Sequence, residues 1–236
     1  MKISTNKSEL QTALQKLSKA TPTRSALPIL SNVLFLVNDE ETTLRTTDLE
    51  ITILLKLAAS IERAGTICMP LQTLLSLTNE MPEDARITIS TKEDNKIEIK
   101  TDIGFYDIIG KPAEEFPALP EIDNRKSIVL GGPTLSELIK KTSFAVSRDE
   151  LKPALSGVLF RFEKDKTTAV ATDGHRLVKS IKNGAGSAGF VGDIIIPRKF
   201  LSLVSNFLPS TEEAQVWVGE NHMTVAFGED VYYTRI

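Results

Sequence analysis

The sequence of 236 residues has very little of the chemistry on which disulfide and metal sites depend. It contains one cysteine, Cys68, and two histidines, His175 and His222. A single cysteine excludes an intrachain disulfide, which is typical of a protein in a reducing compartment. So few thiols and imidazoles also exclude the usual four-ligand zinc site. We therefore expect a cytoplasmic protein without a bound metal or cofactor.

Long apolar stretches are absent as well. The longest, Ile51–Ser60, is interrupted by Lys56 and is much shorter than the ~18 apolar residues of a membrane-spanning helix. The N-terminal residues lack the apolar core of a signal peptide. Hydrophobic residues make up 41% of the chain and charged residues 25%, which excludes a disordered or low-complexity protein. We expect a globular chain with no membrane partner.

The clearest pattern in the chain is an internal repeat. Leu27–Phe35 aligns with Lys152–Phe160 at an offset of 125 residues, and six of the nine aligned positions are identical. Further matches upstream and downstream follow in the same order, at offsets of 125 to 128. A collinear series of this kind predicts a tandem duplication. We expect one domain at residues 1–120 and a second at residues 121–236.

Both copies have the same order of predicted elements. An amphipathic helix is followed by three strands, a second helix that begins with proline, and three more strands. Two helices and seven or eight strands per copy predict an α+β fold, with helices packed on antiparallel sheet. The predicted helices are Ser8–Ala20, Pro70–Asn79, Thr134–Thr142 and Pro197–Phe207; the strands are Val33–Val37, Thr42–Thr47, Ile51–Leu57, Ile87–Ser90, Ile97–Lys100 and Phe105–Ile109, then Val158–Phe162, Thr167–Ala171, Leu177–Ile181, Gln215–Val218, Met223–Phe227 and Val231–Arg235.

Residues 111–121 join the two copies. They contain three prolines and several acidic residues but little helix or strand periodicity, which predicts a semi-rigid connector. The last strand of the first copy, near Phe105–Gly110, corresponds to Val231–Ile236. A second connector would therefore begin where the sequence stops.

Charge is segregated along the chain. The 28 basic and 31 acidic residues give a net charge of −3, and this total argues mildly against nucleic acid as a partner. However, basic residues gather on the polar side and flanks of the predicted helices, although the helix at Pro70–Asn79 carries none. Such a face binds phosphates without reading bases, while ordinary solvation of surface lysines is the alternative. The basic residues in question are Lys7, Lys16, Lys19, Arg24, Lys140, Lys141, Arg198 and Lys199.

Ala171–Leu177, with the sequence Ala-Thr-Asp-Gly-His-Arg-Leu, concentrates the residues that could carry chemistry. Asp173 and His175 are residue types that serve as a general acid–base pair in a hydrolase or nuclease. No nucleophile motif accompanies them, and no phosphate-loop, dinucleotide or EF-hand motif occurs. Asp-Gly is also a common turn dipeptide. A plain turn, a binding surface and a catalytic pair all remain open at this point.

Five segments resemble the bacterial DNA polymerase III beta subunit, the sliding clamp, in collinear order along the whole chain. They are Leu27–Phe35, Glu114–Pro120, Lys152–Phe160, Ala171–Leu177 and Ile194–Phe200. The resemblance implies two DNA-clamp domains in a non-catalytic processivity factor of the replicative polymerase. In this family, six such domains close into a ring whose helices surround duplex DNA. A ring needs only weak, sequence-independent phosphate contacts.

The same resemblance implies two sets of site residues. Arg24 matches a DNA-contacting arginine, and the basic helices would face the DNA. A hydrophobic pocket would capture short linear motifs of the polymerase, the clamp loader and repair proteins. Copy one has Leu49, Glu50 and Ile51 at the corresponding positions, so the pocket belongs to copy two alone. The pocket residues are Leu155, Thr172, Gly174, His175, Arg176 and Leu177.

Two departures from the family stand out. The family's DNA-contacting tyrosines are missing from the loop at residues 149–154. The third domain, which completes the ring joint and the pocket, is also missing. We therefore expect a clamp fragment whose complete form self-associates into a ring. A natural two-domain paralogue that closes as a trimer, and an adaptor that binds only proteins, are the alternatives.

Overall fold

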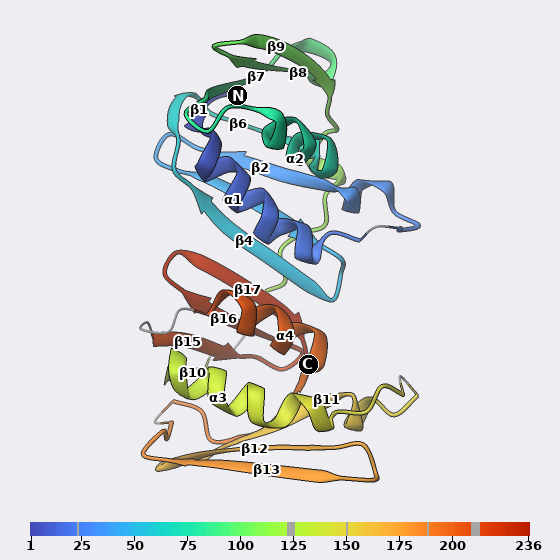
Figure 1. Ribbon diagram of the computed structural model, residues 1–236, viewed down its shortest axis with the longest axis vertical. Coiled ribbons are helices and arrows are strands. Elements are labelled where there is room, and N and C mark those ends of the chain that lie inside the picture. The colour runs from blue at the N-terminus through green and yellow to red at the C-terminus, as the bar shows by residue number, and fades with distance from the viewer. Residues whose placement is uncertain (23, 122–125, 150, 188, 209–212) are drawn as a thin grey trace. The chain divides into compact units, whose positions relative to one another are not determined.

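The computed structural model describes residues 1–22, 24–121, 126–149, 151–187, 189–208 and 213–236. The chain divides into two compact units, Met1–Leu119 and Pro120–Ile236 (Figure 1). Within the described residues, each unit contains two α-helices and antiparallel strands arranged in sheets. The predicted α+β fold with helices on antiparallel sheet is therefore confirmed.

Two helices of the first unit lie next to each other. Helix α1 (Lys7–Leu17) follows strand β1 directly, and its apolar stripe at Leu10, Leu14 and Leu17 is buried. Helix α2 (Leu71–Glu80) packs against α1. The strands run in the orders β5-β1-β7-β8-β9 and β4-β3-β2-β6. They are β1 (Lys2–Asn6), β2 (Asn32–Val37), β3 (Thr42–Thr47), β4 (Ile51–Leu57), β5 (Ser60–Arg63), β6 (Gly65–Pro70), β7 (Arg86–Thr91), β8 (Lys96–Thr101) and β9 (Gly104–Ile109).

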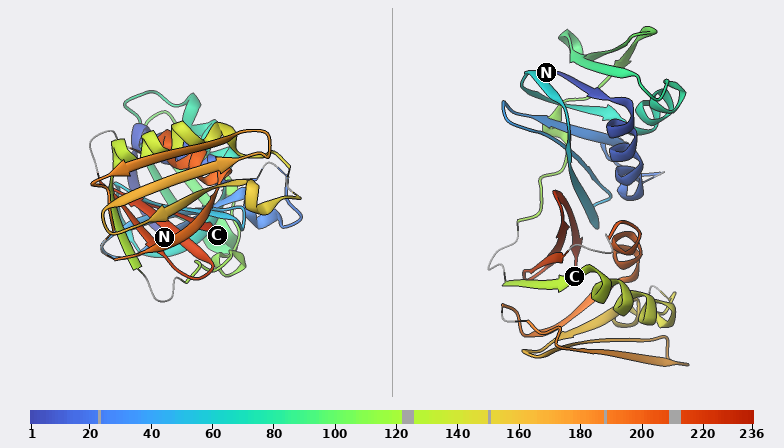
Figure 2. Two further views of the ribbon diagram at one scale, coloured as in Figure 1. Left: turned by 90° about the horizontal axis from the view of Figure 1, so that it is seen from below. Right: turned by 60° about the vertical axis from the view of Figure 1, so that its left-hand side comes forward.

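The second unit repeats this arrangement. Helix α3 (Gly132–Thr142) packs against α4 (Arg198–Phe207), and Figure 2 shows both helices on one side of their strands. The strands run in the orders β10-β15-β16-β17 and β13-β12-β11-β14. They are β10 (Lys126–Gly131), β11 (Gly157–Phe162), β12 (Lys166–Thr172), β13 (Leu177–Asn183), β14 (Gly192–Pro197), β15 (Glu213–Val218), β16 (His222–Phe227) and β17 (Asp230–Arg235).

Several element boundaries differ from the prediction. Helix α1 ends at Leu17 and continues as a 3₁₀ turn to Ala20. Pro70 and Pro197 are the last residues of strands β6 and β14, and each stands one residue before its helix as the N-cap. Strands β1, β5, β6, β10 and β14 were not predicted; four of them run directly into a helix, and β5 has only four residues.

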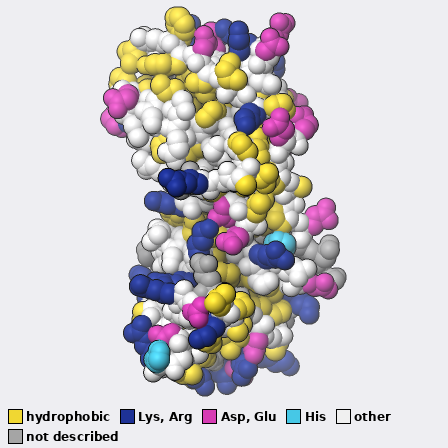
Figure 3. All heavy atoms as spheres, turned by 90° about the vertical axis from the view of Figure 1, so that its right-hand side faces the viewer, with side chains coloured by type: hydrophobic (Ala, Val, Ile, Leu, Met, Phe, Trp, Pro, Cys, Tyr) yellow, Lys and Arg dark blue, Asp and Glu magenta, His cyan; other side chains and the backbone are white. Residues whose placement is uncertain are grey.

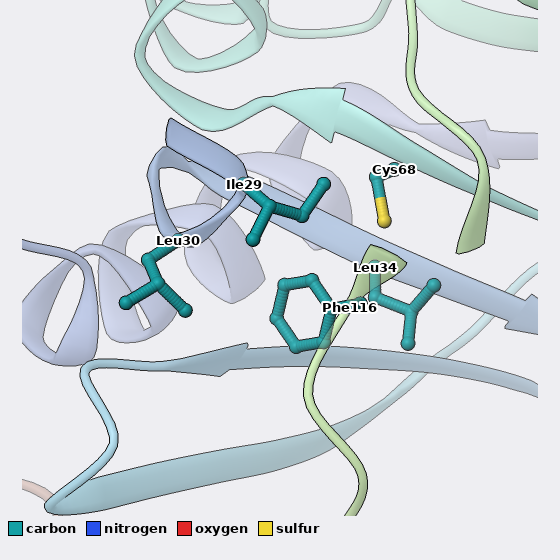
Figure 4. Packing of buried hydrophobic residues seen from close by; sticks show 5 residues of the cluster. All are labelled: Ile29, Leu30, Leu34, Cys68 and Phe116. Carbon is teal, nitrogen blue, oxygen red and sulfur yellow. The ribbon is translucent and has the colours of Figure 1, made fainter. Parts of the chain in front are cut away.

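The connector packs on the first unit at its start, contrary to the predicted semi-rigid spacer. The backbone of Lys111 exchanges two hydrogen bonds with Cys68, at 3.0 and 2.9 Å. Phe116 is buried against Ile29, Leu30 and Leu34 (Figure 4). Backbone pairing and a buried aromatic ring therefore fix residues 111–116, and residues 122–125 lie outside the described part of the chain.

Arg45 closes the same cluster from the side. Its guanidinium donates to the carbonyl of Pro117 at 2.8 Å and lies 5.3 Å from the centre of the Phe116 ring. Burial raises the pKa of the neighbouring Cys68 thiol to about 12, so this cysteine is a poor nucleophile.

No α-helix in the described residues is long and apolar enough to cross a bilayer.

Candidate nucleic-acid interface and peptide-binding turn

A groove of about 540 Å³ runs between α3 and α4 of the second unit. It exists because β10 and β14 each lead directly into a helix, which places the two helices side by side. The exposed side chains of Lys140 and Lys141 line it. Both lysines were predicted as phosphate contacts. The other lining residues are Pro133, Ser136, Glu137, Ser205 and Leu208.

Glu137 is the acidic residue of this groove. Its carboxylate pairs with Lys141 at 2.6 Å, one helical turn away, and with Lys182 of strand β13. These two hydrogen bonds lower the pKa of Glu137 to about 2, so the carboxylate is ionised at neutral pH. Any phosphate that approaches Lys141 must therefore compete with Glu137.

The other predicted basic residues occupy different positions in each unit. Lys19 and Arg24 are exposed after α1, while Lys16 is half-buried. Arg198 and Lys199 form the first turn of α4, where Arg198 is half-buried and Lys199 is exposed. Helix α2 carries no basic residue, so the members of the predicted set in the first unit come from α1 and the segments that flank it.

Lys7 differs from the other predicted basic residues, and its burial argues against the predicted phosphate contact. Its side chain is only 3% exposed and pairs with Glu83, while its backbone N–H donates to Ala85 at 3.0 Å. Lys7 is the first residue of α1. The sequence grouped Lys7 with the other basic residues near the predicted helix, but Glu83 and Ala85, which precede β7, contact it in the structure.

The second candidate site is the turn between β12 and β13. Asp173 Oδ1 accepts hydrogen bonds from the backbone N–H groups of His175 and Arg176, both at 3.0 Å. Thr172 Oγ1 accepts from Gly174 at 3.2 Å and donates to the carbonyl of Arg176 at 2.8 Å. These backbone hydrogen bonds, followed by the Arg176 guanidinium, lower the pKa of Asp173. Gly174 adopts φ +91°, a conformation that favours glycine.

Exposed apolar side chains flank this turn. Leu177 is 65% exposed, and Phe144, which contacts Arg176, is 54% exposed. Leu155 is half-buried and His175 is exposed. On the face drawn in Figure 3, basic side chains of the second unit lie beside hydrophobic ones. Apolar side chains beside fixed polar groups are typical of a surface that binds peptides.

The first unit contains the same turn with different side chains. Asp48 Oδ1 accepts from the N–H groups of Glu50 and Ile51 at 3.0 and 2.7 Å. Leu49 stands at the position of Gly174 and also has a positive φ, +77°. The threonine–aspartate turn is therefore a feature of the repeat. Only the second copy adds the histidine, the arginine and the glycine.

The structure does not support a catalytic pair at Asp173. The carboxylate is engaged by the turn and by Arg176 Nε at 3.0 Å, and the bond to His175 is made by that residue's backbone. Within the described ranges, no group of three or more His, Cys, Asp and Glu side chains could hold a metal ion. A catalytic pair needs a hydrogen bond between the aspartate and the imidazole, whereas His175 bonds to Asp173 through its backbone N–H. The side-chain geometry that a hydrolase would need at Asp173 and His175 is therefore not present at this turn.

A third surface, which sequence reasoning missed, is the outer edge of β9. This strand ends the order β5-β1-β7-β8-β9, and Phe105 is 71% exposed there. Ile103 and Ile109 are more than half exposed beside it. An exposed apolar edge strand readily pairs with another strand.

Comparison with known proteins decides the family. Residues 1–120 match the family model of the DNA polymerase III beta subunit, N-terminal domain, and residues 130–236 match that of its central domain. The chain belongs to the DNA polymerase III beta subunit family.

Individual members of the family agree with this assignment. The beta sliding clamp of Synechococcus elongatus is 31% identical over 241 residues, which cover 99% of this chain and 64% of the relative. The beta sliding clamp of Vibrio cholerae is 28% identical over 239 residues, with coverage of 100% and 64%. The chain thus spans slightly less than two thirds of the length of these relatives.

Solved structures of the family share the fold. A putative DNA polymerase III beta subunit from Eubacterium rectale has a TM-score of 0.93 at 27% identity, over 100% of this chain and 64% of its own. A sliding clamp from Pseudomonas aeruginosa bound to griselimycin has a TM-score of 0.92 at 27% identity, with the same coverage. The predicted resemblance to this family is confirmed.

The sequence did not reveal every residue of the candidate sites. Phe144 and Lys182 come from elements distant in sequence from the residues they contact, and Glu137 was not included among the site residues. The i, i+4 spacing of Glu137 and Lys141 could have revealed that pair. Lys182 approaches Glu137 only because β13 lies beside α3.

Proposed function

We propose that this chain supplies two domains of a sliding clamp, a non-catalytic processivity factor that encircles duplex DNA and tethers polymerases to it. The single observation that carries the proposal is the match of both units to successive domains of the DNA polymerase III beta subunit. A clamp performs no reaction, which agrees with the engaged Asp173 carboxylate. Its place of work would be the cytoplasm.

Duplex DNA is the first proposed partner. The α3–α4 groove offers lysines on a helical surface, and lysines can contact the phosphates of any DNA sequence. Contacts limited to phosphates are weak and fall with salt, so they allow sliding. The proposed phosphate contacts, which leave out Lys7, are Lys16, Lys19, Arg24, Lys140, Lys141, Arg198 and Lys199.

Short peptide motifs of the polymerase, the clamp loader and repair proteins are the second proposed partners. The turn at Thr172–Leu177, with Leu155, would form one wall of their pocket. Leu177 and Leu155 would contact aliphatic or aromatic anchors, because apolar side chains in such pockets carry most of the binding energy. Gly174 leaves space for a close approach, since nothing lies within 4 Å of the position of a Cβ atom there. His175 and Arg176 would form the rim.

Self-association into a ring is the third part of the proposal. The edge of β9 suits this role, because Phe105 and its neighbours combine unpaired backbone groups with apolar side chains. Ring closure would confine DNA without tight contacts, and this explains how a chain with a net charge of −3 can act on DNA.

The DNA part can be tested on the chain itself by NMR titration with two duplexes of equal length and unrelated sequence. We expect shifts at α3, α4 and the segment after α1, the same for both duplexes and abolished by added salt. A preference for one sequence, or cleavage of either duplex, would contradict the proposal.

A further inference from the structure

Two polar contacts hold strand β13 against helix α3, which lies along β12 and β13 (Figure 1). In the middle of the helix, the carboxylate of Glu137 pairs with Lys182 of β13 as well as with Lys141. Just after the helix ends, the Phe144 carbonyl accepts a hydrogen bond from Arg176, the residue before β13. The first contact lies near the end of β13 and the second at its start, so both ends of the strand are fixed to one helix.

The first unit forms the same elements without either contact. Helices α1 and α3 begin and end at a constant offset of 125 residues, and the strand pairs β3–β4 and β12–β13 have the same register at that offset. The residues of the first unit at the four contact positions can form neither the ion pair nor the guanidinium contact. The fold of the repeat therefore does not require them. These residues are Thr12, Lys19, Ile51 and Leu57, in place of Glu137, Phe144, Arg176 and Lys182.

Both contacts occur in the unit that has the candidate peptide-binding turn. Arg176 belongs to this turn, and Leu177, the first residue of β13, is exposed beside it. The other contact reaches the candidate DNA groove, because Lys141 lines this groove and shares the Glu137 carboxylate with Lys182. A continuous series of contacts within one unit thus joins the two candidate sites, and such a series can carry an energetic effect from one site to the other.

A DNA phosphate at Lys141 would change the partners of Glu137. Without DNA, the carboxylate is shared between Lys141 and Lys182. The negative charge of a phosphate attracts Lys141 and repels the carboxylate. Glu137 then pairs with Lys182 alone, and this strengthens the contact between α3 and β13. A strand that is held more firmly loses less conformational entropy when a peptide binds to the turn at its start.

We propose that Glu137 and Lys182 couple the DNA groove to the peptide-binding turn, so that duplex DNA raises the affinity of the second unit for its peptides. The coupling is reciprocal, because two ligands of one protein change each other's affinity by the same factor. We expect a factor of about two to five, because exposed ion pairs make small energetic contributions. The coupling rests on the proposed function, and it favours the capture of partners by protein that already holds DNA.

The test measures the affinity of the full chain for a labelled aliphatic–aromatic motif peptide, with and without a short DNA duplex at low salt. Fluorescence anisotropy gives both affinities, and we expect saturating duplex to raise the affinity of the wild type about two- to fivefold. Lys182→Leu installs the residue of the first unit, and the ratio of the two affinities should then fall to about one. Lys179→Leu is the matched control and should keep the wild-type ratio. Lys179 lies on the opposite face of β13, and the first unit has Leu54 at its position.

Hydrogen exchange provides a second measurement, which needs no peptide. The duplex should slow exchange of the β13 amides in the wild type but not in Lys182→Leu. Glu137→Thr, which installs the other residue of the first unit, should behave like Lys182→Leu. If the duplex or the peptide alone does not bind, the proposed function fails and the coupling fails with it. If both bind and the wild-type ratio is one, or if Lys182→Leu keeps the wild-type ratio, only the coupling is overturned.

Discussion

Arg176 ties the β12–β13 turn to Phe144, a residue 32 positions earlier in the chain. Its guanidinium donates to the Phe144 carbonyl at 3.1 Å and lies 5.5 Å from the centre of the ring. Asp173 accepts from the same guanidinium at 3.0 Å. Arg176 thus holds the exposed ring of Phe144 beside the turn that presents Leu177. The side chains of Phe144 and Leu177 together form a candidate apolar surface for a bound peptide.

Removal of apolar surface at this turn should weaken peptide binding. We expect Leu177→Ala with His175→Ala to lower the affinity for an aliphatic–aromatic motif peptide by about 10-fold or more, because buried anchors carry most of the binding energy. Isothermal titration calorimetry measures the change. Leu49→Ala is the matched control, since Leu49 belongs to the equivalent turn of the first unit. If the double variant and the wild type bound the peptide with equal affinity, this turn would not be part of the peptide-binding pocket.

Loss of the groove lysines should weaken DNA binding equally for all sequences. For Lys140→Ala with Lys141→Ala, we expect the slope of log affinity against log salt to fall by roughly 0.9 for each lost phosphate contact. Fluorescence anisotropy at several salt concentrations measures this slope. Lys166→Ala removes a lysine that pairs with Glu163 and does not line the groove, and it is the control. If the slope fell by as much in the Lys166→Ala control, the effect would come from the change in net charge and not from the groove.

Neutralisation of Glu137 should have the opposite effect. The Glu137→Gln variant frees Lys141 and Lys182 from their carboxylate partner, so we expect a several-fold gain in DNA affinity at low salt and a steeper salt dependence. Glu163→Gln is a control with the same charge change outside the groove. An unchanged or lower affinity of the Glu137→Gln variant would show that phosphates do not reach Lys141.

The pH dependence of the Glu137 pairs follows from their pKa. Because the folded-state pKa of about 2 lies below the usual 4.5, these pairs stabilise the folded state above pH 4.5 and are lost as pH falls through 2. Protonation of Glu137 should therefore not alter DNA affinity between pH 8 and about 5. An NMR titration of the carboxyl carbon checks this value. A midpoint near the usual 4.5 would show that the two lysines do not hold the carboxylate in solution.

The paired turns predict opposite effects of exchanging glycine with a larger residue. Gly174→Ala should lower the free energy of unfolding by about 1 kcal/mol through backbone strain alone, because no atom lies near the new Cβ. Leu49→Gly should raise it by a few tenths to about 1 kcal/mol, because glycine relieves the positive φ. Urea denaturation measures both changes. A destabilised Leu49→Gly variant would mean that packing of Leu49 outweighs its strain.

Lys7 should behave as a structural residue. We expect Glu83→Gln to lower the free energy of unfolding by about 1 kcal/mol, because the buried ammonium loses its charged partner. Lys7→Met should leave DNA affinity unchanged, in contrast to the Lys140 and Lys141 variants. Thermal denaturation and anisotropy provide the two measurements. If the Lys7→Met variant were as stable as the wild type but bound DNA less tightly, Lys7 would belong to the DNA interface.

Local sequence patterns determined the repeat, the four helices and most of the strands. The stripe at Leu10, Leu14 and Leu17 follows the helical period, and strand residues such as those of Ile51–Leu57 carry their own β-branched pattern. The Thr-Asp turn was also predictable, because Asp173 and Asp48 cap backbone groups only two and three residues away. These local features depend on residues that are only a few positions apart in the sequence.

Only the tertiary structure decided which side chains are available and what they contact. Lys7 and Lys140 are both helical lysines, yet packing across 76 residues buries the first against Glu83 and leaves the second exposed. Phe144 reaches Arg176, and Lys182 reaches Glu137, because strands and helices distant in sequence lie together. Burial and ion pairing sum over all neighbours in space. A one-dimensional pattern contains the residue types of a site, but not the contacts that make them act together.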